Sequence, residues 1–116
     1  MDTSLTSRPW GHYLVLKQYG PNTKVKELVV EPGKSLSMQR HQKRQEFWFV
    51  VEGSAIVNGI DANTINSVKM VELQQFDVLQ VGLGEWHQLQ NNGDDILRIV
   101  EIQFGEDCIE EDIERI

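Results

Sequence analysis

The stretch "SMQRHQKRQEFWFVVEG", residues 37–53, sets polar side chains directly before an aromatic and aliphatic block. Alternate side chains of an extended chain point to opposite faces. If residues 35–43 are extended, one face carries the polar side chains of Ser37, Gln39, His41 and Lys43. In the next strand, Glu46 shares its face with Trp48 and Val50. Because buried polar atoms without partners are costly, we infer that this mixed face binds a ligand.

The rest of the chain consists of short apolar and β-branched runs separated by Gly, Pro, Asn and Asp, which is typical of an all-β sandwich or barrel. The strands that we predict cover residues 12–19, 25–31, 35–41, 46–51, 54–58, 64–73, 76–81, 86–91 and 96–104. Only the acidic tail "EEDIERI", residues 110–116, reads as a short helix. A length of 116 residues predicts a single domain, residues 1–116.

Composition excludes several classes of protein. Hydrophobic residues make up 40% and charged residues 25% of the chain, as in a globular protein. No run approaches the roughly 20 apolar residues of a membrane span, and the polar start "MDTSLTSRPWG" lacks a signal-peptide core. We therefore expect a cytoplasmic protein without a membrane partner. The only cysteine, Cys108, excludes a disulfide framework and a cysteine-based zinc site.

Charge is distributed unevenly. The net charge of −7 argues against nucleic-acid binding, which needs a basic face. Residues 105–116 contain six acidic residues and one arginine, whereas residues 34–44 contain four cationic residues and no acidic one. The basic segment is either a seat for a small anion, such as a phosphate or carboxylate, or an ordinary solvated turn.

The histidines suggest a second kind of site. His12 is expected to be a core or surface residue. His41 and His87 each lie in a strand-like run, and Gln39 and Glu46 flank the first of them. Two imidazoles, a carboxylate and an amide oxygen form a plausible nitrogen and oxygen site for zinc, manganese, iron or cobalt.

Two long segments resemble the two motifs of the cupin superfamily. They are "EPGKSLSMQRHQKRQEFWFVVEG", residues 31–53, and "FDVLQVGLGEWHQLQNNGDDILRIVEIQFG", residues 76–105. The closest likeness is to type II mannose-6-phosphate isomerases, including the cupin half of bifunctional mannose-1-phosphate guanylyltransferase/mannose-6-phosphate isomerases. Residues 8–11 and 109–115 resemble further segments of that family.

This resemblance implies a double-stranded β-helix, a jelly-roll barrel that holds one divalent metal ion (Zn, Mn, Co, Fe or Ni). It implies His41, Glu46 and His87 as metal ligands, with Gln39 as a further candidate. It also implies a homodimer formed through an outer strand face and a sugar phosphate as the small-molecule substrate.

Lys43 stands where the family has its second motif histidine. A cation facing a metal repels it unless desolvation lowers its pKa. Three outcomes follow for this departure. Gln39 completes the metal site, the site is weak, or Lys43 itself binds the substrate phosphate or acts as a base.

Other departures concern the phosphate. Gly82 replaces a proline, Ile109 replaces a glycine, and the sequence lacks the Asp-x-Tyr-Gly-Arg ending usual in the family. If that arginine holds the phosphosugar, another must substitute for it. The candidates for substrate binding are Arg8, Arg40, Arg44, Arg98 and Asn91. Strand parity argues against Arg40, which should point away from the face of His41, whereas Arg44 lies in a turn.

The function expected from these parts is metal-dependent aldose–ketose isomerisation of a hexose 6-phosphate, with Lys43 or an unliganded Glu46 carrying the proton. The alternative is a cupin that binds a sugar phosphate or nucleotide sugar without catalysis, or that catalyses another reaction on a sugar, such as epimerisation. Glu101 and Gln103 alternate with apolar residues, so they either face the cavity or form a polar strand end.

Overall fold

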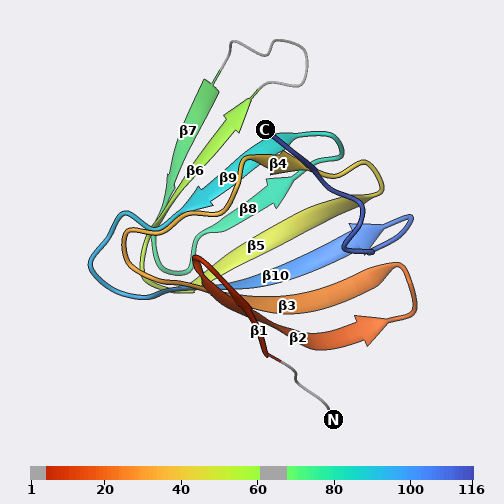
Figure 1. Cartoon of the computed structure of the whole chain (residues 1–116), viewed down its shortest axis with the longest axis horizontal. Coiled ribbons are helices and arrows are strands. Elements are labelled where there is room, and N and C mark those ends of the chain that lie inside the picture. Colours follow the sequence, from red (N-terminus) through yellow and green to blue (C-terminus); the bar gives the residue numbers. More distant parts are fainter. Residues whose placement is uncertain (1–4, 61–67) are drawn as a thin grey trace.

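The computed structural model describes residues 5–60 and 68–116, which form two antiparallel sheets (Figure 1). The first sheet has the order β1-β2-β3-β10-β5-β8 and the second has the order β11-β4-β9-β6-β7. The strands are β1 (Leu5–Arg8), β2 (Gly11–Tyr19), β3 (Thr23–Val30), β4 (Gln39–Arg40), β5 (Arg44–Glu52), β6 (Ala55–Ile60), β7 (Val68–Leu73), β8 (Val78–Val81), β9 (Trp86–Gln90), β10 (Leu97–Gly105) and β11 (Glu114–Arg115).

The register of β3, β10 and β5 divides the inner face of the first sheet into an apolar end and a polar end. At the apolar end, Ile99 of β10 lies between Leu28 of β3 and Val50 of β5. Toward the other end, the next two inward rows across the same three strands are polar. These rows are Lys26–Glu101–Trp48 and Lys24–Gln103–Glu46. Because inward positions recur every second residue, strand pairing alone gathers these polar groups.

The apolar end is covered by the second sheet. Val57 of β6 and Leu89 of β9 are paired there and pack with Leu28, Val50 and Ile99 in one buried cluster. Burying this surface supplies the main stabilisation, at about 25 cal/mol per Å² of apolar area. Trp48 belongs to this cluster, and the polar side chains of its row and of the next row lie beyond it, where they are available to line a site.

All nine predicted strands correspond to strands of the structure, β2 to β10, which confirms the all-β jelly-roll expectation. Two differ in extent. Of residues 35–41, only Gln39–Arg40 form a ladder, and the first part of the predicted strand 64–73 lies outside the described residues. The prediction missed β1 and β11, which pair with β2 and β4.

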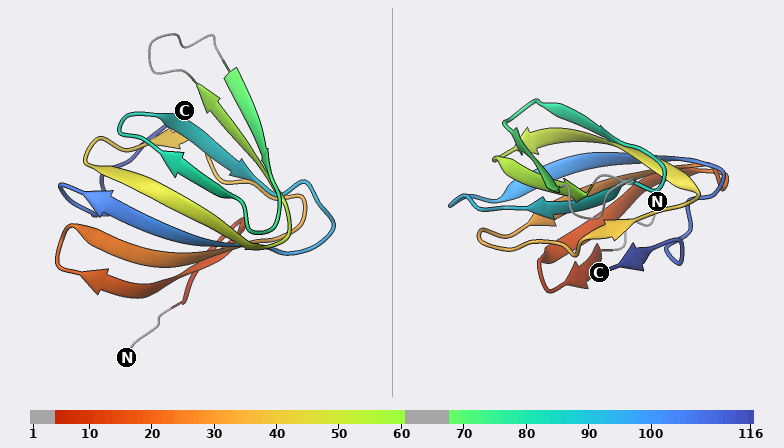
Figure 2. Two further views of the ribbon diagram at one scale, coloured as in Figure 1. Left: turned by 180° about the vertical axis from the view of Figure 1, so that it is seen from behind. Right: turned by 90° about the horizontal axis from the view of Figure 1, so that it is seen from above.

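The expectation of a helical tail was wrong. The acidic tail instead follows the edge of the second sheet, where Glu114 and Arg115 pair with Arg40 and Gln39 and the Ile116 N–H donates to the Met38 carbonyl (Figure 2). An open edge of a sheet offers backbone partners that a helix of seven residues cannot match. No helix among the described residues has the length and hydropathy to cross a membrane.

Gly53 closes the turn between β5 and β6 with φ +83°, and a Cβ there would lie 2.5 Å from the Ile96 carbonyl oxygen. Gly53→Ala should therefore lower the free energy of unfolding by roughly 2–4 kcal/mol, the sum of left-handed strain and a backbone clash. Gly20→Ala is the matched control, because φ is +57° but no atom lies within 4 Å of its Cβ. Its cost should stay near 1 kcal/mol. Equal losses in urea unfolding would contradict this account of the turn.

Candidate metal and sugar-phosphate site

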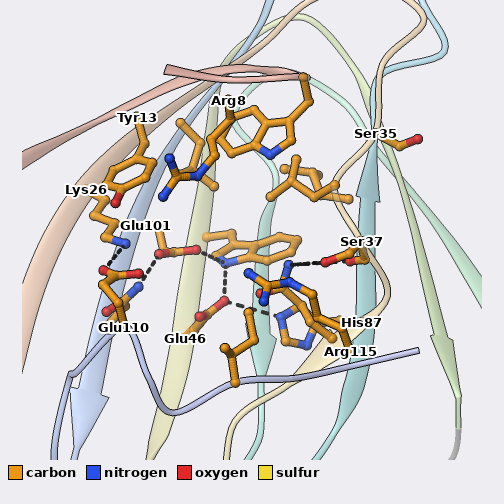
Figure 3. A pocket seen from close by; sticks show the side chains of 18 of the residues that line it. Arg8, Tyr13, Lys26, Ser35, Ser37, Glu46, His87, Glu101, Glu110 and Arg115 are labelled. Carbon is orange, nitrogen blue, oxygen red and sulfur yellow. Dashed lines mark hydrogen bonds and ion pairs between the residues drawn. The ribbon is translucent and has the colours of Figure 1, made fainter. Parts of the chain in front are cut away.

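A cavity of about 420 Å³ opens at the polar end of the first sheet (Figure 3). Its lining comes from both sheets and from the C-terminal segment, residues 109–116. The charged part of the lining consists of four cationic side chains and three carboxyl groups, Arg8, Lys26, Arg44, Arg115, Glu46, Glu101 and Glu110. A cationic cavity in a protein of net charge −7 favours an anionic ligand.

Three buried side chains of metal-ligand type meet at one end of this cavity. His41, Glu46 and His87 each offer a ligand atom within 4.8 Å of the other two. The carboxylate of Glu46 lies between the imidazoles, 3.2 Å from His41 Nε2 and 3.6 Å from His87 Nε2. The three residues come from β5, from β9 and from the turn after β4, so the meeting of the two sheets creates the cluster.

Backbone carbonyls fix the tautomers of both imidazoles. His41 Nδ1 lies 2.7 Å from the carbonyl oxygen of Asp112, and His87 Nδ1 lies 2.9 Å from that of Glu85. Each Nδ1–H therefore donates to a carbonyl, and each ring turns its Nε2 toward the Glu46 carboxylate. This support is the usual one behind metal-bound histidines. Two imidazole nitrogens and a carboxylate that converge in this way form a donor set that fits a divalent metal ion.

Arg44 supplies positive charge to the same atoms in this structure. Its Nε donates to Glu46 at 3.2 Å, and its Nη2 lies 3.3 Å from His41 Nε2. The guanidinium also donates to the Ile109 carbonyl and separates His41 from the open cavity. A metal ion would compete with Arg44 for these two ligand atoms, so Arg44 would have to give up both bonds when an ion binds.

The charges of the cluster are set by burial and by one another. Burial raises the pKa of Glu46, but the hydrogen bond from His41 and the positive fields of His87, His41 and Arg44 outweigh it, so this pKa lies well below its usual range. Burial lowers the pKa of His87 more than the Glu46 charge raises it. The cluster at neutral pH therefore contains an ionised carboxylate and a neutral His87 imidazole, the forms that bind metal.

Glu101 has the opposite protonation state. Its Oε2 and the Oε1 of Glu46 each lie 3.1 Å from Trp48 Nε1, which donates between the two carboxyl groups. Gln103 donates to the other Glu101 oxygen at 2.7 Å. Burial, followed by the charge of Glu46, raises the pKa of Glu101 to about 8. Two carboxyl groups with such different pKa values in one cavity point to different roles.

Lys43 does not reach the site. Parity along residues 35–43 predicted that it would share the face of His41, but β4 ends at Arg40 and the chain bends before β5. The side chain of Lys43 is exposed, and the backbone N–H of Lys43 donates to the Asp112 carboxylate at 2.9 Å. Parity applies only within an unbroken strand, so the buried cation of this motif is Arg44, the first residue of β5.

Of the other substrate-binding candidates, Arg44 and Arg8 line the cavity and three do not. Arg40 lies 4.6 Å from the Trp86 ring and pairs with Glu114, as parity predicted. Arg98 points to the outer face, where it pairs with Glu27 and Glu52. The amide nitrogen of Asn91 donates to the backbone carbonyls of Val30 and Asp95, and its amide oxygen accepts the Gly93 N–H. Asn91 therefore holds a loop in place.

Gln39 lines the cavity and lies directly opposite His87 in the β4–β9 ladder. Its amide nitrogen donates to Ser37, which leaves the amide oxygen as the atom that could bind a metal. Lys26 and Arg115 also line the cavity, although no role was predicted for them. The sequence carried a signal for Lys26, because Lys24 and Lys26 stand in phase with the inward Leu28 and Val30.

Comparison with known proteins agrees with this geometry. The solved structure of the capsular polysaccharide assembling protein CapF from Staphylococcus aureus superposes on the whole chain with a TM-score of 0.86 at 15% identity, covering 33% of that chain. Oxalate decarboxylase from Bacillus subtilis gives a TM-score of 0.84 at 16% identity over 99% of this chain and 30% of its own. At such identities the likeness shows the fold alone, and the fold is that of a cupin.

The sequence relatives are more specific. The chain belongs to the Mannose-6-phosphate isomerase C-terminal family, whose model matches residues 3–116. It is 38% identical over 109 residues to mannose-1-phosphate guanylyltransferase of Sinorhizobium fredii, covering 94% of this chain and 20% of the relative. Alginate biosynthesis protein AlgA of Pseudomonas putida is 38% identical over 108 residues, with 93% and 21% covered. The chain thus spans about one fifth of the length of these curated relatives.

The raised pKa of Glu101 predicts a pH dependence of stability in protein freed of metal. The unfolded value is 4.5 and the folded value is about 8, so folding takes up a proton between them and stability falls as pH rises through this window. The slope is at most about 1.4 kcal/mol per pH unit. Urea unfolding from pH 5.5 to 8.5 should show this loss in the wild type relative to Glu101→Gln. Parallel curves would mean that Glu101 is ionised in the folded protein.

Proposed function

We propose that this protein isomerises a hexose 6-phosphate, mannose 6-phosphate to fructose 6-phosphate, with a divalent metal ion. One observation carries the proposal. A buried His41–Glu46–His87 cluster borders a cationic cavity, which Glu46, His87 and a neutral Glu101 line, in a chain that belongs to the Mannose-6-phosphate isomerase C-terminal family. The names of these longer relatives concern guanylyl transfer and alginate biosynthesis, so the isomerase role rests on the family and on the site.

The metal would be held by His41, Glu46 and His87, with the amide oxygen of Gln39 as a further ligand. Nitrogen and oxygen donors of this kind suit zinc, manganese, iron, cobalt and nickel. When bound, a divalent ion supplies Lewis-acid stabilisation of negative charge on substrate oxygens, worth several kcal/mol. Glu46 serves as a ligand here and not as the proton carrier, because its pKa is held below the usual range.

Glu101 takes the role of proton carrier that was expected for Lys43. Isomerisation moves the hydrogen on C2 of the aldose to C1 and the proton on O2 to O1. A carboxyl group that can both accept and donate near neutral pH suits this transfer, and the pKa of Glu101 lies at about 8. Trp48 and Gln103 hold the carboxyl in place through the two hydrogen bonds that they donate.

Replacing Glu101 should remove catalysis while leaving binding intact. Glu101→Gln keeps the shape of the neutral acid but cannot carry a proton, so kcat should fall by about 10²–10⁴ while KM changes little. The matched control is Glu31→Gln, an exposed carboxyl directly after β3. Steady-state conversion of mannose 6-phosphate to fructose 6-phosphate measures both variants. A variant with unchanged kcat would remove Glu101 from the reaction.

The metal site itself is tested by metal content. Mass spectrometry of protein purified without an affinity tag should show one divalent ion per chain, and the isomerase assay should respond to added Zn²⁺, Mn²⁺ or Co²⁺. His87→Ala should lose both metal and turnover, because only two ligands of the buried cluster remain. His12→Ala, in β2 and outside the cluster, should retain both. Retention of metal by His87→Ala would overturn the ligand assignment.

One observation favours a second candidate function. The guanidinium of Arg44 already neutralises Glu46, and Lys43 stands where the family has a histidine, so the cavity can exist without a metal. Under this alternative the protein binds a sugar phosphate or nucleotide sugar and does not isomerise it. Metal-free protein that binds mannose 6-phosphate without turnover in any added metal would decide for the binding function.

A further inference from the structure

Two lysine side chains of β3 point into the interior of the protein. Lys24 and Lys26 continue the inward row that Leu28 and Val30 form further along the strand. Their side chains are 9% and 5% exposed. Lysine is almost never buried this deeply unless an anion neutralises it. The partner of these two ammonium groups therefore indicates what this end of the cavity binds.

In the part of the chain that the structure describes, the carboxylate paired with both lysines is Glu110 of the C-terminal segment. Its Oε1 lies 2.6 Å from Lys26 Nζ and 3.4 Å from Lys24 Nζ. Burial raises the pKa of Glu110, but the hydrogen bond from Lys26 and the charges of both lysines lower it more, so the group is anionic. One carboxylate thus faces two ammonium groups, and its own side chain is 48% exposed.

Further groups make the same end of the cavity cationic. The ammonium of Lys26 lies 4.2 Å from the centre of the Tyr13 ring, and the guanidinium of Arg8 lies 5.4 Å from the same ring. Figure 3 shows Lys26, Tyr13 and Arg8 on one side of the cavity and His87 on the other. A ligand in the cavity can therefore place an anionic group by the lysines and a second group by the histidines.

We propose that Lys24 and Lys26 form the seat for the phosphate of the substrate and that Glu110 occupies this seat until the phosphate displaces it. The identity of the sugar rests on the proposed function, whereas the phosphate seat does not. A phosphate monoester carries about −1.5 to −2 charges at pH 7 and three acceptor oxygens, so it matches two ammonium groups better than one carboxylate does.

The exchange explains why Glu110 is only half buried. Two buried lysines without an anion would be strongly destabilising, so the empty seat needs a stand-in. A carboxylate on an exposed segment can leave for solvent, where it is hydrated, when a more highly charged group arrives. Binding then replaces one anion with another and leaves the lysines paired throughout.

This exchange predicts opposite effects for two variants at one site. Lys26→Gln removes a charge-assisted hydrogen bond and should weaken mannose 6-phosphate binding by about tenfold or more. Glu110→Gln removes the competing anion and should strengthen binding by several-fold at pH 6.5. The measurement is isothermal titration calorimetry on the full chain after metal removal with EDTA, so it does not depend on turnover.

The controls distinguish the contribution of the phosphate to binding from that of the sugar. They also distinguish the effect of the two buried lysines from the effect of net charge. Mannose should bind far more weakly than mannose 6-phosphate, and inorganic phosphate should compete with the latter. Lys17→Gln and Glu111→Gln change the net charge equally at exposed positions and should leave affinity unchanged. The proposal fails if Lys26→Gln and Glu110→Gln both bind like the wild type, or if mannose binds as well as its phosphate. Loss of isomerase activity alone would contradict the proposed function but not the phosphate seat, because the seat is tested by binding.

Discussion

The buried carboxylate of Glu46 is the constraint on which the site depends. An ionised carboxyl group away from water is stable only when positive charge and hydrogen-bond donors surround it. Here the partners come from four directions, since Arg44 shares its strand, the two imidazoles approach from the second sheet and the turn before β5, and Trp48 donates from the next inward position. The two imidazoles then need support of their own, which the carbonyls of Asp112 in the C-terminal segment and of Glu85 provide.

The same sheet provides both stability and chemistry because its register places them at opposite ends. Rows such as Leu28–Ile99–Val50 pack against apolar side chains of the second sheet, whereas the rows with Glu46 and Glu101 meet His87 of that sheet and line the cavity. A shift of β10 by one residue against its neighbours would turn Ile99 and Glu101 outward together. Fold and site are therefore specified by one pairing, and neither can change alone.

Much of this could be predicted from the sequence where the information is local. Alternation along residues 46–51 placed Glu46 and Trp48 on one inward face, and turn residues located most strands. The motifs identified the cupin fold, and the structure brings His41, Glu46 and His87 together. Extending the same parity back by two residues would have placed Arg44 beside Glu46.

The rest depends on contacts between distant segments. The side chain of Lys43 was predicted on the wrong face because a bend interrupts the strand. Alternation along the sequence does not reveal where a strand bends. Whether Glu101 faces the cavity depends on the pairing of β10 with β5, in which Glu101 lies opposite Trp48, 53 residues earlier in the chain. The C-terminal segment was read as a helix because its partners in β4 are far away in sequence. The expected homodimer and cytoplasmic location stay predictions.

Asp112 serves the site with two different parts of one residue. Its carboxylate accepts the N–H groups of Gln42 and Lys43, while its backbone carbonyl accepts from His41 Nδ1. Alanine scanning would remove the carboxylate and report a loosened turn, yet it would leave the carbonyl in place. Side-chain mutagenesis therefore cannot test the backbone carbonyl that sets the tautomer of His41. Replacing the amide that contains this carbonyl with an ester is the kind of change that would test it.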